Sequence, residues 1–363
     1  MGLMLLVLGL YLEPVMVAKD VVSVLPLDGA TVLLIDGEGA GHTLNPLTGS
    51  TSPWSPSWSP GEDGWVDDGY IFATNLSPDG NHLLILKGVY VPDRFGFPEG
   101  YDGMRSAVLV ILSRPDGSHA TPVAVSVAAG GGPDYAFTTD SRFIVGGPMF
   151  SCEPTPEAYS AHVRGDSGNL AMEPVNRIDV STGERSLIAG LDISDGFWKC
   201  PYSDWARLEN NWYAEHTFGS IATGGVSGFF RVPGGEARVH GWVLDDALLI
   251  TTRDGQGLLF VDGSFVPCPS GTWDVLSWLP DGRFIYERDG SGNLVLGEVD
   301  WEAFSAPPGG LDVRIPEDIR HVSSMPMPST PCTGILFHDR WGSGNLWFLR
   351  TARQAQVRSA GQH

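Results

Sequence analysis

The sequence predicts an all-β protein, folded as a single β-propeller of four-stranded antiparallel blades. Two observations support this prediction. A short unit of three apolar runs separated by two tight turns recurs along the chain, and the composition is that of a protein with many turns. The 363 residues include 47 glycines and 27 prolines, and no long helical pattern interrupts them. A sheet unit that repeats every 40 to 50 residues or so is typical of a propeller.

The repeat is clearest in residues 275–299. Its first turn is Pro280-Asp281-Gly282, where proline fixes φ, aspartate can bond its own backbone and glycine supplies a positive φ. Its second turn lies at residues 289–292, and the intervening residues 283–287 are rich in β-formers. The unit therefore predicts an antiparallel meander.

Further copies of the first turn extend from residue 27 to residue 334. Their centres are Asp28, Asp79, Asp140, Asn210, Asp246, Asp281 and Cys332. Seven centres predict seven blades. The alternative is six, if Glu209 and Asp246 belong to one distorted blade.

The turns at Asp79 and Asp281, and residues 178–187, resemble the repeats of TolB-type (WD-repeat-like) propellers. This resemblance extends over about residues 20 to 355. Its motifs are structural turns, so it implies a fold and no catalytic residue. We expect residues 20–359 to form the propeller, with no second domain.

The first 19 residues allow three interpretations. Residues 1–12 are apolar and residues 15–18 are small or apolar, as in a signal peptide, but a positive n-region is missing. The segment could instead be the strand that closes the ring, or the remnant of a longer anchor. Twelve apolar residues are too few to cross a bilayer, so we expect no membrane span in the main body.

The net charge of −21 argues against nucleic acid, which requires a basic surface. It is typical of a soluble, self-repelling surface. Attraction of a cation or a basic partner is the alternative.

The longer segments between strands, which depart from minimal turn length, should mark the functional face. They are residues 53–66, 91–104, 151–172, 191–202 and 307–318. We expect all five on the face formed by the connections between strands b and c and between strand d and the next strand a. This b–c/d–a face is therefore the predicted binding face.

Polar residues that close the second strand of each blade should also reach that face. They are Asp36, His216, Arg253, Asp254, Glu287, Asp289, His338 and Asp339. If the protein is an enzyme, His216, Glu287, Asp289 and His338 are the candidate catalytic residues, and His216 and His338 are the candidate ligands of a divalent metal. The alternative is that these side chains serve the turns, since tight hairpins use such residues.

Aromatic residues complete the predicted binding surface. Trp54, Trp58, Trp65, Trp198 and Trp341 lie in or beside the long segments, where indole rings can stack on a sugar or a cation. Together with Asp36, Arg253, Asp254 and Asp339 they form the predicted binding set. Packing between blades is the alternative role of these tryptophans.

Four cysteines, Cys152, Cys200, Cys268 and Cys332, form no C-x-x-C pair, which argues against a zinc site. If the protein is exported, a Cys152–Cys200 disulfide is expected. The alternative is four buried thiols.

The sequence therefore favours a non-catalytic propeller that binds a protein, peptide or glycan and needs no cofactor. We expect it outside the cytoplasm, in the periplasm, on the envelope or secreted. The first alternative is a glycan lyase or hydrolase, with or without a divalent metal. The second is a purely structural surface protein.

Overall fold

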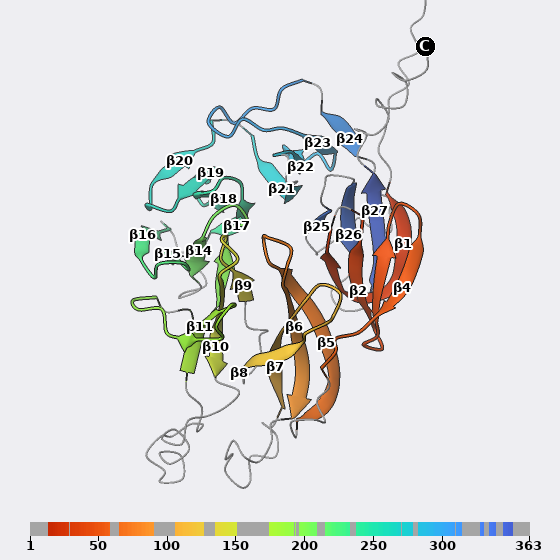
Figure 1. Cartoon of the computed structure of the whole chain (residues 1–363). Helices are drawn as coiled ribbons and strands as arrows, with labels where there is room; N and C mark the ends of the chain where they lie inside the picture. The colour runs from red at the N-terminus through yellow and green to blue at the C-terminus, as the bar shows by residue number, and fades with distance from the viewer. Residues whose placement is uncertain are drawn as a thin grey trace, which may run out of the picture.

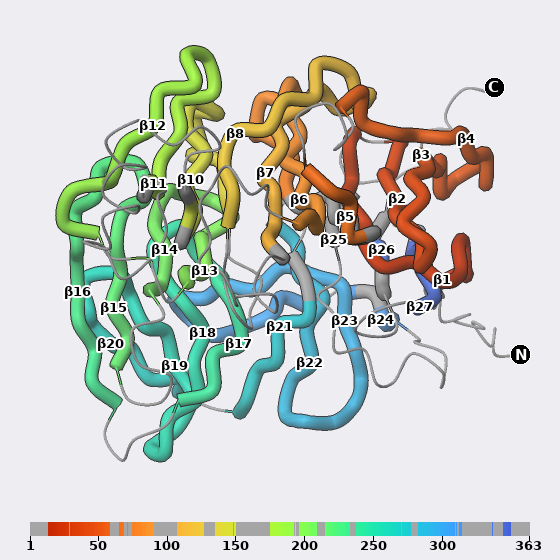
Figure 2. Tube along the Cα trace, turned by 90° about the horizontal axis from the view of Figure 1, so that it is seen from below, coloured from red at the N-terminus to blue at the C-terminus, as the bar shows by residue number. Residues whose placement is uncertain are grey.

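The fold is known from a computed structural model of the chain. It describes residues 14–28, 30–58, 65–90, 106–126, 135–150, 174–191, 193, 196–208, 215–232, 237–269, 271–278, 282–308, 310–313, 327–329, 334–338 and 344–350. Every regular element in this part of the chain is a strand, so the all-β prediction is correct. The sheets follow one another in chain order around a ring (Figure 1), and the view from below shows the same order (Figure 2).

The ring is closed by a sheet that joins both ends of the described chain, which we call the composite sheet. In β1, residues near the start pair with β27 (Val15 with Phe348), and residues near the end pair with β2 (Leu25 with Leu33). The strands, in chain order, are β1 (Val15–Pro26), β2 (Val32–Asp36), β3 (Gly41–Asn45), β4 (Ser50–Trp54), β25 (Met327–Ser329), β26 (Gly334–His338) and β27 (Gly344–Arg350).

Five four-stranded units complete the ring, all of them antiparallel meanders. The first two units are β5 (Val66–Leu76), β6 (Leu83–Tyr90), β7 (Ser106–Ser113) and β8 (Thr121–Ser126), then β9 (Tyr135–Phe137), β10 (Phe143–Phe150), β11 (Pro174–Asp179) and β12 (Arg185–Ser186). A single residue pair, Phe150 with Val125, joins them.

The other three units are separate sheets. They are β13 (Phe197–Lys199), β14 (Trp205–Leu208), β15 (Glu215–Ser220) and β16 (Val226–Arg231); β17 (Arg238–Trp242), β18 (Ala247–Thr252), β19 (Gly255–Phe260) and β20 (Phe265–Pro267); and β21 (Trp273–Trp278), β22 (Phe284–Arg288), β23 (Leu294–Gly297) and β24 (Leu311–Val313).

The prediction of seven separate blades is wrong, and the propeller has six. The strands β25–β27 form no sheet of their own, because β1 continues them into β2–β4 as one seven-stranded sheet. The composite sheet and the five meanders make up the six units. The alternative count of six assumed that Glu209 and Asp246 belong to one distorted blade. In the structure they belong to different units, because Asp246 lies in the sheet β17–β20 and residue 209 follows β14 in the separate sheet β13–β16.

One turn was placed in the wrong connection. Asn210 was expected between the first and second strands of a blade, yet β13 and β14 both precede it and β15 follows it. The actual first turn of this unit lies at residues 200–204, between β13 and β14. Within this unit, the strand that follows Asn210 is therefore the third of its sheet and not the second.

The core lies between neighbouring sheets. Leu33, Leu83, Leu109 and Ile111 pack the composite sheet against β5–β8, and Trp273, Phe284 and Tyr286 pack β21–β24 against Leu249 and Leu258 of β17–β20. The composite sheet also folds on itself, because Val32 and Leu34 of β2 pack against Leu336 and Phe348. Each sheet thus buries its faces only with help from its neighbours, as the repeat predicted.

The aspartates of the repeat shape its turns. Oδ1 of Asp79 accepts hydrogen bonds from Ser77 Oγ at 2.6 Å and from the backbone N–H of Asn81 at 3.0 Å. The Ser77 hydrogen bond is the main reason why the pKa of Asp79 falls to about 2. Asp140 accepts equivalent bonds from Thr138 Oγ1 and the Arg142 backbone N–H. These carboxylates are therefore structural.

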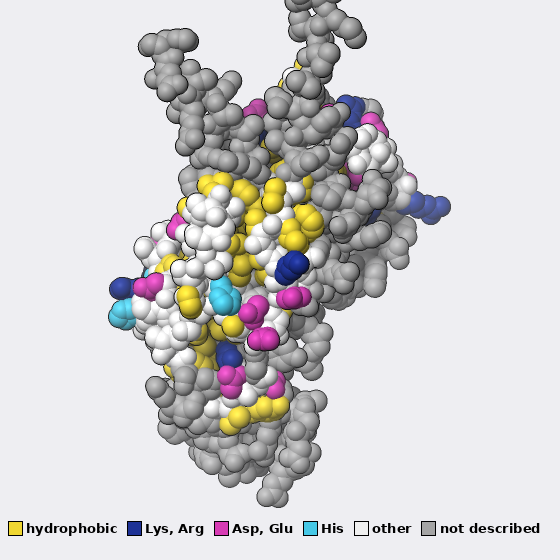
Figure 3. Space-filling view, turned by 90° about the vertical axis from the view of Figure 1, so that its right-hand side faces the viewer, with side chains coloured by type: hydrophobic (Ala, Val, Ile, Leu, Met, Phe, Trp, Pro, Cys, Tyr) yellow, Lys and Arg dark blue, Asp and Glu magenta, His cyan; other side chains and the backbone are white. Residues whose placement is uncertain are grey.

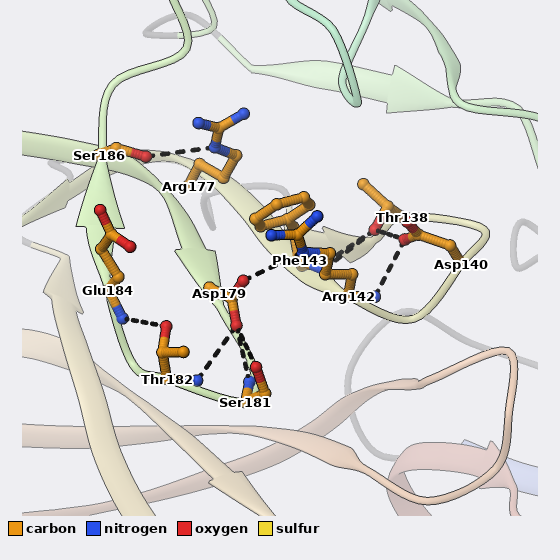
Figure 4. Close-up of polar contacts among 10 residues, drawn as sticks. All are labelled: Thr138, Asp140, Arg142, Phe143, Arg177, Asp179, Ser181, Thr182, Glu184 and Ser186. Atoms are coloured by element: carbon orange, nitrogen blue, oxygen red, sulfur yellow. Dashed lines mark hydrogen bonds and ion pairs between the residues drawn. The ribbon is translucent and has the colours of Figure 1, made fainter.

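Asp179, another turn aspartate, links two turns of the unit β9–β12 (Figure 4). Asp179 accepts from the hydroxyl and backbone N–H of Ser181, and its other oxygen lies 3.2 Å from Nε of Arg142. The guanidinium carbons of Arg142 and Arg177 lie 4.7 and 4.8 Å from the centre of the Phe143 ring. Cation–π contact thus positions both arginines.

Candidate functional site

Strand direction decides which connections share a face of the ring. In an antiparallel meander, the b–c connection and the d–a connection leave the same end of the strands. Residues 91–105 and 151–173 connect second to third strands and residues 55–65 connect a fourth strand to the next first strand, so the described strands that flank three of the five predicted long segments end at this face. The other two predicted segments are not single connections on this face. Strand β13 lies within residues 191–202, and residues 307–310 connect the third strand β23 to the fourth strand β24, which is a connection on the opposite face.

The predicted polar residues at the ends of second strands serve mainly in turns. Asp36 Oδ1 accepts from the backbone N–H groups of Glu38 at 3.0 Å and Ala40 at 2.9 Å, and its Oδ2 lies 3.3 Å from His42 Nε2. Glu287 Oε1 accepts from the backbone N–H of Gly292 at 2.5 Å. Turn formation is thus the use that the structure shows for both carboxylates.

Three more predicted residues lie at the same end of the ring. Arg253 and Asp254 are exposed in the two-residue turn between β18 and β19. Asp289 follows β22 with a φ of 64° and lies 3.5 Å from Nε of Arg288. All three are therefore on the predicted face.

The predicted tryptophans are mostly within the packing of the ring. Trp54 and Trp65 are 7% and 3% exposed in the core between the composite sheet and β5–β8, and Trp58 packs against the same core. Trp198 packs partly buried between β13–β16 and β17–β20, where its carbonyl accepts from Trp242 Nε1 at 3.1 Å. Packing between sheets is the role that these contacts show.

His216 differs from its predicted position. It lies in β15, the third strand of its unit, and is 3% exposed. Nε of Arg207 donates to its Nδ1 at 2.8 Å. Burial, and secondly the charge of Arg207, lower the pKa of His216 to about 4, so this imidazole is neutral at physiological pH.

The predicted catalytic set is spread over three sheets. His216 belongs to β13–β16, Glu287 and Asp289 to β21–β24, and His338 ends β26 of the composite sheet. The side chain of His338, and residues Asp339, Trp341 and Cys152, lie outside the described part of the chain. Cys200 is a buried free thiol whose Sγ lies 3.5 Å from the carbonyl of Leu244. Its pairing with Cys152 stays a prediction.

A polar cluster that the sequence analysis missed joins the sheets β17–β20 and β21–β24, at the b–c/d–a end of their strands. We call it the His240 cluster: His240 of β17, Thr251 of β18, Gln256 of β19, and Trp273 and Asp274 of β21. Asp274 Oδ1 lies 2.5 Å from His240 Nδ1, and Thr251 Oγ1 lies 2.8 Å from His240 Nε2. The His240 side chain is 5% exposed and that of Asp274 is 34% exposed.

Gln256 holds the free edge of the first strand of the next sheet. Its Nε2 donates to the carbonyl of Trp273 at 2.6 Å, and its Oε1 accepts from the backbone N–H of the same residue at 2.5 Å. Trp273 is fully buried. Its backbone would otherwise leave a donor and an acceptor unsatisfied away from water, so this amide fastens one sheet to the next.

Hydrogen-bond accounting fixes the state of His240. Because Gln256 Oε1 accepts from Trp273, Nε2 of Gln256 is a donor, and it lies 3.3 Å from His240 Nε2. The Asp274 carboxylate can only accept, so in neutral His240 the proton lies on Nδ1, opposite Asp274, and Nε2 is an acceptor. The Thr251 hydroxyl donates to His240 Nε2, and the second N–H of Gln256 is shared between His240 Nε2 and Thr251 Oγ1, each 3.3 Å away.

The order threonine, histidine, aspartate is that of an activated nucleophile. Here, however, the hydroxyl both donates and accepts within the cluster, and the same glutamine anchors the next sheet. The cluster therefore attaches the sheet β17–β20 to the sheet β21–β24, and we call this contact between the two sheets the joint. Sequence patterns did not indicate the cluster, because His240 lies at an irregularity in the pairing of β17 with β18, between Val239 and Gly241, which no local pattern predicts.

Ion pairs gather at the same end of the ring. Lys87–Asp67 at 2.8 Å, Arg231–Glu215 at 3.6 Å, Arg238–Asp274 at 3.6 Å and Arg288–Asp289 at 3.5 Å all lie there, and we call them the charged rim. Arg142–Asp179 lies at the opposite end. The rim thus presents both signs of charge on an otherwise acidic protein.

The side of the ring that carries the composite sheet has a different surface. Apolar side chains form a band there, with acidic and basic side chains beside it (Figure 3). Val15 and Met16 of β1 are among the exposed large hydrophobic residues of the described chain.

No group of three or more His, Cys, Asp or Glu residues in the described ranges could hold a metal ion.

No helix in the described residues is long and apolar enough to cross a membrane.

No family model and no curated protein matches the chain. The similarity to TolB-type repeats thus stays a prediction.

Among solved structures the chain is similar to WD40 propellers. The propeller domain of Doa1 matches with 11% identity and a TM-score of 0.46, over 95% of this chain and 99% of that one. The propeller domain of Cps50 (Swd1) from Myceliophteria thermophila matches with 9% identity and a TM-score of 0.47, over 93% and 98%. The C-terminal WD40 domain of Sif2 matches with 9% identity and a TM-score of 0.46, over 95% and 100%.

At these identities and TM-scores the matches carry no argument about a partner or an activity. The fold follows from the strand topology of the chain itself: an all-β, six-bladed propeller.

Proposed function

We propose that this protein is a non-catalytic binding scaffold, and that its b–c/d–a face contacts a protein or peptide partner. The charged rim is the observation that supports this proposal. Of the pairs between Lys or Arg and Asp or Glu described above, only Arg142–Asp179 lies on the opposite face. Interfaces use such mixed charges for specificity and for the rate of association.

The geometry of the joint adds to this proposal. Arg238, whose side chain is 73% exposed, lies 3.6 Å from Asp274, and Asp274 is itself held by His240. The exposed pair is thus anchored to a buried network, which keeps its orientation fixed before a partner binds. Pre-organised groups bind with a smaller loss of entropy. We extend the proposal to a glycan partner on the same face and to a location outside the cytoplasm.

Charge reversal on the two faces tests the assignment. The rim variant carries Arg231→Glu and Arg238→Glu, whose side chains are exposed, and the matched control carries Arg142→Glu and Arg177→Glu on the opposite face. Both are immobilised and exposed to cell extract of the source organism and, separately, to a glycan array. We expect the rim variant to lose the ligands that the wild type retains and the control to keep them. Equal retention by the rim variant would overturn the choice of face.

The salt dependence of retention provides a second readout. Contacts made by exposed charges weaken as ionic strength rises, since the Debye length falls from about 10 Å at 0.1 M salt to about 3 Å at 1 M. Retention by the wild type should therefore fall with salt. Retention that is independent of salt would mean that the rim does not contribute.

A further inference from the structure

The contact between β17–β20 and β21–β24 combines an apolar core with the polar side chains of the His240 cluster. β21 pairs with β22 through one edge, and at its other edge Gln256 bonds both backbone groups of Trp273. These two sheets are neighbours in the ring (Figure 1). The joint therefore requires Gln256 to keep its present orientation.

His240 is the one member of the cluster whose hydrogen-bonding role changes with pH in the neutral to mildly acidic range. In the neutral form its Nε2 accepts, as both Gln256 and Thr251 require. In the protonated form Nε2 carries a hydrogen and becomes a donor. Two donors, His240 Nε2 and Gln256 Nε2, would then face each other at the present 3.3 Å. Gln256 cannot reverse its amide without losing both bonds to Trp273.

Charged groups from each neighbouring strand act on this equilibrium. Burial lowers the pKa of His240, the Asp274 carboxylate opposes that change, and Arg238 on the same strand adds to it; the net direction is downward. From β22, Glu287 is the cross-strand neighbour of Asp274, and the Arg288 guanidinium lies 5.3 Å from the Trp273 ring centre. Thr251 and Gln256 contribute no charge.

We propose that the His240 cluster is a pH-sensitive contact, and that uptake of one proton by His240 destabilises the joint between the sheets β17–β20 and β21–β24. Protonation places a donor opposite the Gln256 amide N–H. The two hydrogen bonds between Gln256 and the Trp273 backbone therefore weaken, and the edge of β21 loses its contact with Gln256. This inference stands whether or not the charged rim binds a partner.

The direction of the effect follows from linkage. In the open joint His240 is solvated and has its ordinary pKa near 6.5, whereas in the closed joint the pKa is lower. The closed state is therefore fully favoured above about pH 6.5 and loses stability as the pH falls. Between 6.5 and the pKa of the closed state, opening is coupled to the uptake of up to one proton, so the opening constant rises as the pH falls, by at most about tenfold per pH unit.

Hydrogen exchange at the Trp273 backbone amide measures this opening directly, because that N–H is the donor to Gln256. Exchange would be followed in the intact protein from pH 7.5 to 5, corrected for the intrinsic rate at each pH. We expect the opening constant at residues 272–276 to rise in the wild type as the pH falls below 6.5, by up to about tenfold per pH unit. We expect no rise in His240→Gln, which cannot take up a proton. A flat wild-type profile, or an equal slope in both proteins, would overturn the proposal.

Two further variants guard against a local folding defect in His240→Gln. Asp274→Asn retains an acceptor for Nδ1–H but removes the charge that favours the imidazolium in the closed joint, so the rise should begin at the same pH and continue to a lower pH than in the wild type. An unchanged profile would count against the proposal. His216→Gln removes the other buried imidazole, which lies in β15, and should leave the slope at residues 272–276 as in the wild type. Loss of the slope in this variant would assign the effect to His216 and overturn it.

Discussion

Replacing Gln256 by leucine should destabilise the protein by about 2–6 kcal/mol. The change removes both hydrogen bonds to the Trp273 backbone, at 2.6 and 2.5 Å, and leaves one donor and one acceptor unpaired beside a fully buried residue. Each such group costs about 1–3 kcal/mol when it is buried without a partner. Leucine is similar in volume to glutamine, so a cavity should contribute little.

Urea unfolding of the two proteins, followed by circular dichroism, measures the difference in the free energy of unfolding. Thr251→Val is the matched control, since it removes one hydroxyl from the same cluster and leaves the clamp on Trp273 in place. It should cost about 1–2 kcal/mol, since the hydroxyl makes hydrogen bonds with His240 and Gln256 and each has a typical net value of about 1 kcal/mol. A cost below about 0.5 kcal/mol for Gln256→Leu, or a larger cost for Thr251→Val, would refute the assignment of Gln256 as the anchor.

Two other predictions concern a glycine and a buried histidine. Gly228 has a φ of 63° and a Cβ there would clash with the carbonyl of Val261, whereas Gly290 has a φ of 61° and open space around it. Gly228→Ala should therefore lower the thermal midpoint clearly more than Gly290→Ala, which has only the backbone cost of about 1 kcal/mol; equal shifts would contradict the close approach. His216 has a pKa lowered to about 4 in the folded state, so its contribution to stability is complete above about pH 6.5 and is lost as the pH falls towards 4, by up to roughly 3 kcal/mol. His216→Gln should remove that part of the pH dependence in urea titrations, and an unchanged pH profile would show that the histidine is already solvated.

The local parts of the fold were predictable because they are encoded within a few residues. The turns at Asp79 and Asp140 combine a hydroxyl, a carboxylate and a following backbone N–H, all within five residues. Such turns can be read from the sequence wherever they are intact. The turn assigned to Asn210 failed because asparagines also suit a b–c connection, and that single error placed His216 at the end of a second strand.

The parts that failed depend on contacts between distant residues. Whether β25–β27 stand alone is decided by the pairing of Val15 with Phe348 and of Leu25 with Leu33 around one shared strand. The His240 cluster requires three strands of one sheet and one of the next to bring together a histidine, a threonine, a glutamine and an aspartate. No spacing rule connects such residues, since the twist and packing of the sheets set their distance.

The shared strand β1 also bears on how the chain reaches its native state. Val15 and Phe348 are 333 residues apart in the sequence, and closing an unstructured loop of that length costs roughly 5 kcal/mol in chain entropy. The five meanders can form from local pairing as the chain leaves the ribosome, but β1 must wait for β27. The ring is therefore expected to close last, and until then an edge of β1 remains open to pairing with another chain.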